Sequence, residues 1–169
     1  IRLKLQRLDS QKEQIKALRE DIHAMREIQK EYAHEYYLMG NECITKAKDA
    51  NAAIRNFDKA LKLDPYYVDA WVRKGVTLMD QGEDYEAQVC LNKAVKLNPG
   101  SFKARYNRGK CLLRLKYYEE AVSDLLKAVD LKPKHAYAHD YLAECYAALG
   151  DEESAQNHRD IADELRNNS

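Results

Sequence analysis

The sequence predicts an all-α protein in which four helix pairs stack into a solenoid, preceded by a long N-terminal helix. Pro65, Pro99 and Pro133 are spaced 34 residues apart. Two columns of alanine keep the same period: Ala60, Ala94, Ala128 and Ala162, and Ala53, Ala87, Ala121 and Ala155. Such self-similarity is typical of a solenoid, because each unit is too small to bury its own apolar face and must stack on its neighbours.

Within one unit the apolar residues have helical spacing. In the third copy, Leu112 and Leu115 follow Gly109, and after a short turn at 116–118 a stripe of i, i+3/i+4 spacing runs over 121–129. Each proline of the 34-residue series lies just past a helix that it cannot continue. Each copy therefore predicts two helices joined by a tight turn.

The second copy carries the residues of a known repeat. It reads Trp71-x2-Lys74-Gly75-x2-Leu78, then Ala87-x3-Leu91, Ala94 and Pro99. This resembles the tetratricopeptide repeat (TPR), W-x2-L-G-x2-Y followed by A-x3-F and a closing Pro. The resemblance covers residues 33–169 as repeats 33–67, 68–101, 102–135 and 136–169, with one extra residue between Gly40 and Ala53. It implies a right-handed α-solenoid of four TPR helix pairs, whose first helices line a concave groove.

Residues 1–32 precede the repeats and carry a different pattern. Leu8, Ile15 and Ile22 are seven residues apart, and a second set with the same spacing comprises Leu18, Met25 and Tyr32. This is the a/d seam of about three heptads. A capping-box pattern at Ser10 and Glu13 offers a start for the helix that would leave 1–8 separate. Two interpretations stay open: a helix folded onto the first repeat as a cap, and a coiled coil that joins two copies as a homodimer.

The composition excludes several classes of function. The 28 Lys and Arg balance the 28 Asp and Glu, so general binding to nucleic acid or to an anionic membrane is not expected. The sequence contains no apolar run of membrane-spanning length and no signal-peptide pattern. It begins at Ile1 without an initiator Met, so we expect a fragment or a processed product.

No catalytic chemistry is predicted. The chain lacks a phosphate-binding loop, a nucleophile elbow and a zinc-protease motif, so we expect neither an enzyme nor a cofactor. His135 and His139 would supply only half of a zinc site, and we interpret them as a loop and an interface residue. The cysteines form no CxxC and are interpreted as small buried residues of an intracellular, cytoplasmic protein; they are Cys43, Cys90, Cys111 and Cys145.

The zero net charge hides an uneven distribution. Repeat 102–135 carries +5 and repeat 136–169 carries −6. By the resemblance, the residues that face the groove are Tyr37, Asn41, Val72, Arg73, Val76, Met79, Lys103, Tyr106, Asn107, Lys110, Arg114 and Tyr141. Their basic and aromatic character predicts that the groove binds a protein or peptide segment with acidic and apolar side chains.

The predicted function is therefore that of a non-catalytic scaffold or adaptor. One branch of the family grips the C-terminal carboxylates of heat-shock chaperones; of the residues it uses, only Asn41 and Lys103 match here, which speaks against such a clamp, although a co-chaperone-like role stays within the hypothesis. Two alternatives are open. The chain could assemble with itself through the heptad helix or the charged third and fourth repeats, or it could be the targeting arm of a longer enzyme.

Overall fold

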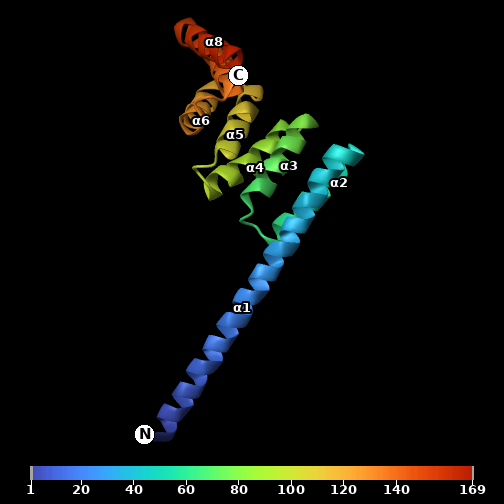
Figure 1. Ribbon diagram of the computed structural model, residues 1–169, viewed down its shortest axis with the longest axis vertical. Helices are drawn as coiled ribbons and strands as arrows, with labels where there is room; N and C mark the ends of the chain where they lie inside the picture. Colours follow the sequence, from blue (N-terminus) through green and yellow to red (C-terminus); the bar gives the residue numbers. More distant parts are fainter. Residues whose placement is uncertain (1, 169) are drawn as a thin grey trace.

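In the computed structural model, which describes residues 2–168, the chain is a right-handed α-solenoid (Figure 1). The elements are α1 (Arg2–Glu42), the short π-helix η1 (Cys43–Ala47), α2 (Ala50–Leu63), α3 (Val68–Asp80), α4 (Asp84–Leu97), α5 (Phe102–Arg114), α6 (Tyr118–Leu131), α7 (Ala136–Ala148) and α8 (Glu152–Asn167). The end of α1 pairs with α2, and three further pairs follow, α3 with α4, α5 with α6 and α7 with α8. This is the fold class that the 34-residue period predicts.

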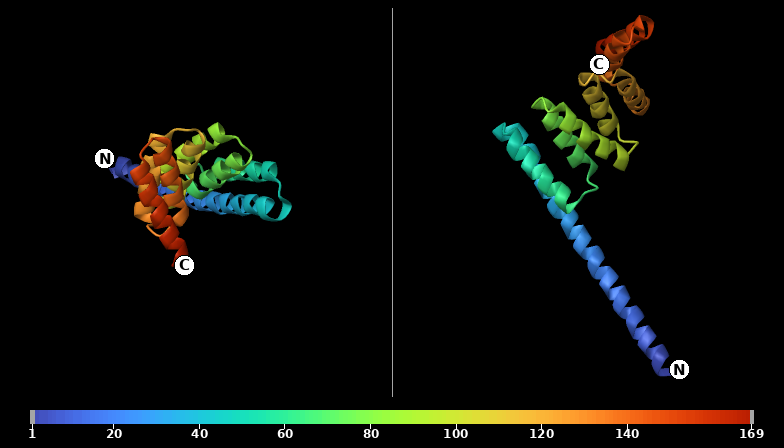
Figure 2. Two further views of the ribbon diagram at one scale, coloured as in Figure 1. Left: turned by 90° about the horizontal axis from the view of Figure 1, so that it is seen from above. Right: turned by 180° about the vertical axis from the view of Figure 1, so that it is seen from behind.

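Helix α1 is much longer than a repeat helix, and most of it stands alone. It runs without a break from Arg2, so the capping-box pattern at Ser10 does not start the helix. Figure 1 and the right view of Figure 2 show its N-terminal part leading away from the repeats. Every side chain described in residues 2–32 is exposed, and burial begins at Ala33. These residues therefore do not fold back onto the first repeat as a cap.

The extra residue of the first repeat is absorbed in η1. A residue with positive φ closes the turn inside each repeat, and these residues, Lys48, Gly82, Lys116 and Gly150, are spaced 34 apart. The first repeat therefore regains the common register at Lys48. The additional residue lies before it, where a π-helical turn holds one residue more than an α-helical turn.

Close approach of the two helices in a repeat depends on small residues in the first helix. A Cβ atom added to Gly109 would lie 2.6 Å from Cγ of Leu125, and one added to Gly75 would lie 2.8 Å from Cγ of Leu91. Leu91 and Leu125 are fully buried. The glycines therefore make room for the large side chain that the second helix places against them.

One hydrogen bond recurs in three repeats although a different side chain makes it each time. A ring or guanidinium N–H near the start of the first helix donates to the backbone carbonyl of the proline six residues earlier. The pairs are Trp71 Nε1 with Pro65 at 2.9 Å, Arg105 Nε with Pro99 at 3.0 Å and His139 Nε2 with Pro133 at 3.0 Å. The bond fixes the loop between repeats to the helix that follows.

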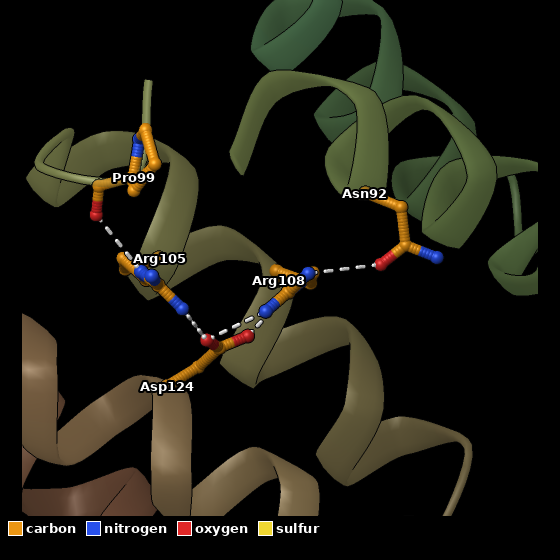
Figure 3. Close-up of polar contacts among 5 residues, drawn as sticks. All are labelled: Asn92, Pro99, Arg105, Arg108 and Asp124. Atoms are coloured by element: carbon orange, nitrogen blue, oxygen red, sulfur yellow. Dashed lines mark hydrogen bonds and ion pairs between the residues drawn. The ribbon is translucent and has the colours of Figure 1, made fainter. Parts of the chain in front are cut away.

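A buried carboxylate in the third repeat binds two arginines (Figure 3). The Asp124 side chain on α6 is 2% exposed. It accepts hydrogen bonds from Arg105 Nη1 at 2.7 Å and from Arg108 Nη2 at 2.8 Å, and Arg108 Nε also donates to it. Arg108 reaches Asn92 on α4 at 3.2 Å as well. The cluster joins α4, α5 and α6 and uses two of the basic residues that give the third repeat its positive charge.

The last repeat ends the stack with polar contacts. Arg159 stands where Phe57, Leu91 and Leu125 fill the second helix of the other repeats, and it forms an ion pair with Glu152 at 2.6 Å. The cysteines are free thiols, three of them buried and Cys43 half-buried. Among the described helices, none combines the length and the apolar character that a membrane span requires.

Candidate protein-binding groove

The first helices of three successive repeats enclose a hollow of about 380 Å³. It is lined by seven of the predicted groove residues and by one further residue. The seven are Tyr37, Asn41, Val72, Arg73, Val76, Lys103 and Asn107, and the addition is Asp69. α1, α3 and α5 contribute these side chains because equivalent positions in successive repeats lie side by side in a solenoid.

Arg73 lines this hollow from α3, the middle one of the three helices, and has a neutral partner. Its Nε donates to Oδ1 of Asn41 at 2.6 Å, and within residues 2–168 it takes part in no ion pair. Lys103, by contrast, is 3.2 Å from a carboxylate oxygen of Asp69. The half-buried guanidinium of Arg73 therefore keeps its charge available to an acidic ligand, and Val72 and Val76 on the same helix provide apolar wall beside it.

The remaining predicted residues are distributed differently from the expectation. Met79 is 1% exposed and belongs to the core, so it offers no surface to a ligand. Arg114 turns toward the start of α4, where it pairs with Asp84 at 2.9 Å. Lys110 is half-buried on α5 and does not line the hollow. The basic patch expected near the middle of the groove is therefore reduced by contacts inside the protein.

Aromatic rings lie at both ends of the hollow. On the α1 side, Tyr37 and Tyr67 have ring centroids 5.1 Å apart, and the hydroxyl of Tyr67 is 2.7 Å from Nδ1 of His34. Burial, and then the neighbouring Tyr37, raise the pKa of Tyr67 to about 12, so this hydroxyl stays protonated. On the α5 side, Tyr106 packs against Tyr141 at 5.7 Å.

The second aromatic group continues beyond the hollow. Tyr106 stacks on Phe102 at 5.5 Å and meets His135 edge-on at 4.8 Å. The ammonium group of Lys132 lies 4.6 Å from the centre of the Phe102 ring. Tyr106 and Tyr141 thus form a rim of aromatic surface next to the hollow and not part of its wall.

The histidines outside the hollow pack against other side chains, and two of the buried thiols have raised pKa values. Among residues 2–168, no three His, Cys, Asp or Glu side chains are grouped to hold a metal ion. His135 packs among aromatic rings, and His139 faces His158 with 3.0 Å between their Nδ1 atoms. Burial raises the pKa of Cys111 to about 11 and that of Cys145 to about 12, so both stay protonated and unreactive at neutral pH.

Sequence reasoning placed Asp69 and Lys103 at equivalent positions of the groove but did not predict the ion pair between them. Asp69 stands in the same repeat position as Lys103, and its ion pair with that lysine crosses from one repeat to the next. Asp84 holds Arg114 in a comparable way. The 34-residue register identifies Asp69 as a neighbour of Lys103, and this was the one signal in the sequence for the pair.

Comparison with known proteins agrees with the helix pairs and their period. Two family models, both described as tetratricopeptide repeat, match residues 45–107 and 102–135. The chain belongs to the tetratricopeptide repeat family. Tetratricopeptide repeat protein 16 of Mus musculus is 30% identical over 122 residues, which are 68% of this chain and 16% of that protein. The inactive TPR repeat-containing thioredoxin TTL3 of Arabidopsis thaliana is 35% identical over 86 residues, 51% of this chain and 12% of that protein. The chain thus spans less than a fifth of the length of these relatives.

Solved TPR structures share the fold. MamA from Desulfovibrio magneticus has a TM-score of 0.73 at 28% identity, with 81% of this chain and 77% of that chain covered. YrrB, described as a TPR protein with an unusual peptide-binding site, has a TM-score of 0.70 at 25% identity and coverages of 88% and 81%. The first TPR domain of Spaghetti (RPAP3), bound to the HSP90 peptide SRMEEVD, has a TM-score of 0.69 at 26% identity and coverages of 72% and 95%. The chain is a protein-interaction module of this architecture.

Proposed function

We propose that the hollow between α1, α3 and α5 binds a protein segment that carries acidic and apolar side chains, and that the chain acts as a non-catalytic scaffold or adaptor. The observation that carries this proposal is Arg73: a half-buried guanidinium that lines the hollow from its middle helix and whose partner Asn41 is neutral. A carboxylate of the ligand replaces or joins the Asn41 amide, and the bond to Arg73 becomes charge-assisted.

The surroundings of Arg73 set the rest of the ligand's chemistry. Val76 and Tyr37, which are half-buried, accept apolar side chains next to the carboxylate. Lys103 provides a second cation when a ligand carboxylate displaces Asp69. A ligand with two acidic residues should therefore bind more tightly than a ligand with one. The ligand binds as an extended or helical segment, since the hollow crosses three repeats.

Chaperone-tail recognition is the more specific version of this proposal. The HSP90 peptide held by the Spaghetti domain combines acidic and apolar residues, which favours a ligand of that class. Against the clamp itself, Asn41 and Lys103 already bond to Arg73 and Asp69. The proposal therefore keeps the ligand chemistry and leaves the chaperone tail as one member of the class.

The test uses two labelled peptide pools, one combining Asp and Glu with Leu, Met and Val, and a second with Lys and Arg in place of the acids. Fluorescence anisotropy should detect binding of the acidic pool alone. Arg73→Ala should weaken it by about 10-fold or more, since a hydrogen bond between charged groups contributes about 1.5–3 kcal/mol. Reversal of Lys103 and Lys110 to Glu should weaken it as well. Lys93→Ala, on an exposed part of α4, is the matched control. Equal binding of both pools would overturn the proposal.

A second candidate function is that of a targeting arm. The matched relatives are several times longer than the aligned region, so most of each relative lies outside it. In such a protein, the groove binds the partner, and another part of the longer chain acts on that partner. Expression of the complete reading frame, followed by an activity assay with and without Arg73→Ala, separates this role from that of a free adaptor.

A further inference from the structure

We propose that residues 8–32 of α1 form a parallel, two-stranded coiled coil with a second copy of this chain. The proposal is independent of what the groove binds. It assigns a partner to the part of α1 that the repeats leave uncovered and fixes the relative direction of the two helices.

The repeats leave the apolar seam of α1 uncovered, and this seam needs a partner. The apolar residues of the seam are 46–59% exposed, and they are Leu8, Ile15, Leu18, Ile22, Met25 and Tyr32. Ion pairs within the described part of residues 2–32 are two, Lys12 with Asp9 and Lys30 with Glu27, and both are exposed. A lone helix in water draws little stability from such pairs, because most helical stability in proteins comes from packing of an apolar face.

The residues at positions a and d of the seam favour a two-stranded coiled coil. Position a holds Leu8, Ile15, Ile22 and Gln29, and position d holds Gln11, Leu18, Met25 and Tyr32. The middle of the seam has Ile15 and Ile22 at a with Leu18 at d, a combination that favours two parallel strands over three or four. The polar Gln11 lies inside the seam, where two copies in equal register can hydrogen-bond to each other. The seam covers about 36 Å of helix.

The charges at positions e and g beside the seam favour parallel helices over antiparallel ones. Position e holds Lys12, Arg19 and Arg26. An antiparallel pair places e residues against e residues, and here it would set cations against cations. A parallel pair instead places position g against e of the next heptad, which brings Asp21 beside Arg26 of the second copy, twice by symmetry. Arg7 would face Lys12 of the second copy and set two positive charges against each other. The proposed coiled coil therefore begins at residue 8.

The consequence is a dimer with both solenoids at the same end. The C-terminal part of each α1 enters its own first repeat at Ala33, so the two sets of repeats diverge from one stalk. Two hollows that face one partner, or two neighbouring partners, act together. Linkage of two sites in this way raises overall affinity without new contacts.

The first test compares matched pairs of substitutions on the same helix. Leu18→Glu with Met25→Glu places charges at two d positions, whereas Ala17→Glu with Ala24→Glu places the same charges on the opposite face. Light scattering coupled to size exclusion, over a dilution series of the full chain, should give twice the mass of one chain for the parent and for the Ala17/Ala24 variant. The Leu18/Met25 variant should give the mass of one chain, with unchanged helical content in the repeats by circular dichroism. A monomeric parent, or a dimer that survives Leu18→Glu with Met25→Glu, would overturn the proposal.

The second test addresses direction. Asp21→Arg alone and Arg26→Asp alone should each weaken the dimer, because each sets like charges against each other in a parallel pair. The double variant exchanges the two charges and should restore dimerisation to the parent level at the same ionic strength. A dimer in which the double variant is no tighter than the two single variants would contradict the parallel arrangement, even where the Leu18/Met25 variant is monomeric.

Discussion

The contact that most clearly holds the third repeat together is the one between Asp124 and two arginines, and its removal should be costly. Asp124→Ala leaves the guanidinium groups of Arg105 and Arg108 without their carboxylate. Those side chains are only 11% and 22% exposed, so water reaches them poorly. Arg105 keeps one bond, to the carbonyl of Pro99, and Arg108 keeps the bond to Asn92.

The magnitude follows from what remains buried. Removing one partner of a buried ion pair costs about 3–5 kcal/mol, because an uncompensated charge stays in the protein. In a chain of this size, 1 kcal/mol corresponds to roughly 2–4 °C in the melting temperature. Asp124→Ala should therefore lower the melting temperature by roughly 6–20 °C. Asp124→Asn keeps one acceptor oxygen and turns an N–H toward the arginines, so its cost should be smaller but of the same sign.

The assay is urea-induced unfolding followed by circular dichroism, with Asp130→Ala as the control. Asp130 lies on the same helix α6 and is exposed, so its removal should change the free energy of unfolding by no more than about 0.5 kcal/mol. A loss below about 1 kcal/mol for Asp124→Ala would show instead that the two arginines find water or other partners at little cost.

Three further predictions concern packing, backbone and pH, each measured as the free energy of unfolding in urea. Gly109→Ala should destabilise by about 1–3 kcal/mol through its contact with Leu125, whereas Gly100→Ala, with room for a Cβ, should be nearly neutral. Lys116→Gly should stabilise the protein by up to about 1 kcal/mol because φ is +64° at that residue, and Gly82→Lys should destabilise it. Stabilities equal to that of the parent would contradict the view that both positions require the left-handed conformation. Burial, and then the nearby His139, lower the pKa of His158 below that of an unfolded imidazole, about 6.5, so the unfolded chain binds more protons than the folded chain near that pH, and stability should fall as the pH is lowered through it. His158→Gln should remove part of this fall, and a parallel pH profile in the variant would contradict the assignment.

The period of the sequence predicts the fold because each column has one physical role. Small residues at Gly75 and Gly109, large ones at Leu91 and Leu125 and the closing prolines recur in phase, and the structure uses them for the same contacts in each repeat. The exposed seam of α1 follows equally from the heptads. The sequence did not predict that α1 continues through residue 33 into the first repeat, because it holds no signal there for either an end or a continuation of the helix.

Substitutions within a column limit what the sequence can say about the turns. Gly82 and Gly150 signal a left-handed residue, but Lys48 and Lys116 take the same conformation without a glycine. The extra residue before Ala53 was visible as an insertion, yet its conversion into a π-helical turn depends on the register of the chain on both sides.

The groove was predicted in position more closely than in charge. Positions such as Asn41, Arg73 and Asn107 follow from the register, and they do line one hollow. Counting charges per repeat overstated the basic patch because Arg105 and Arg108 turn inward to Asp124. Which cation meets which carboxylate depends on side-chain geometry across helices, and one-dimensional spacing does not contain it.

Binding of an acidic and apolar segment at Arg73 can be observed directly by nuclear magnetic resonance. The isotopically labelled chain is titrated with the acidic peptide pool, and the backbone amide shifts are followed residue by residue. The largest changes should cluster at Tyr37, Asn41, Arg73 and Lys103, and at the same peptide concentration they should be much smaller in Arg73→Ala, whereas Lys93→Ala should retain them. Changes confined to the outer helices α4 and α6, or shifts of equal size in Arg73→Ala, would contradict binding at Arg73.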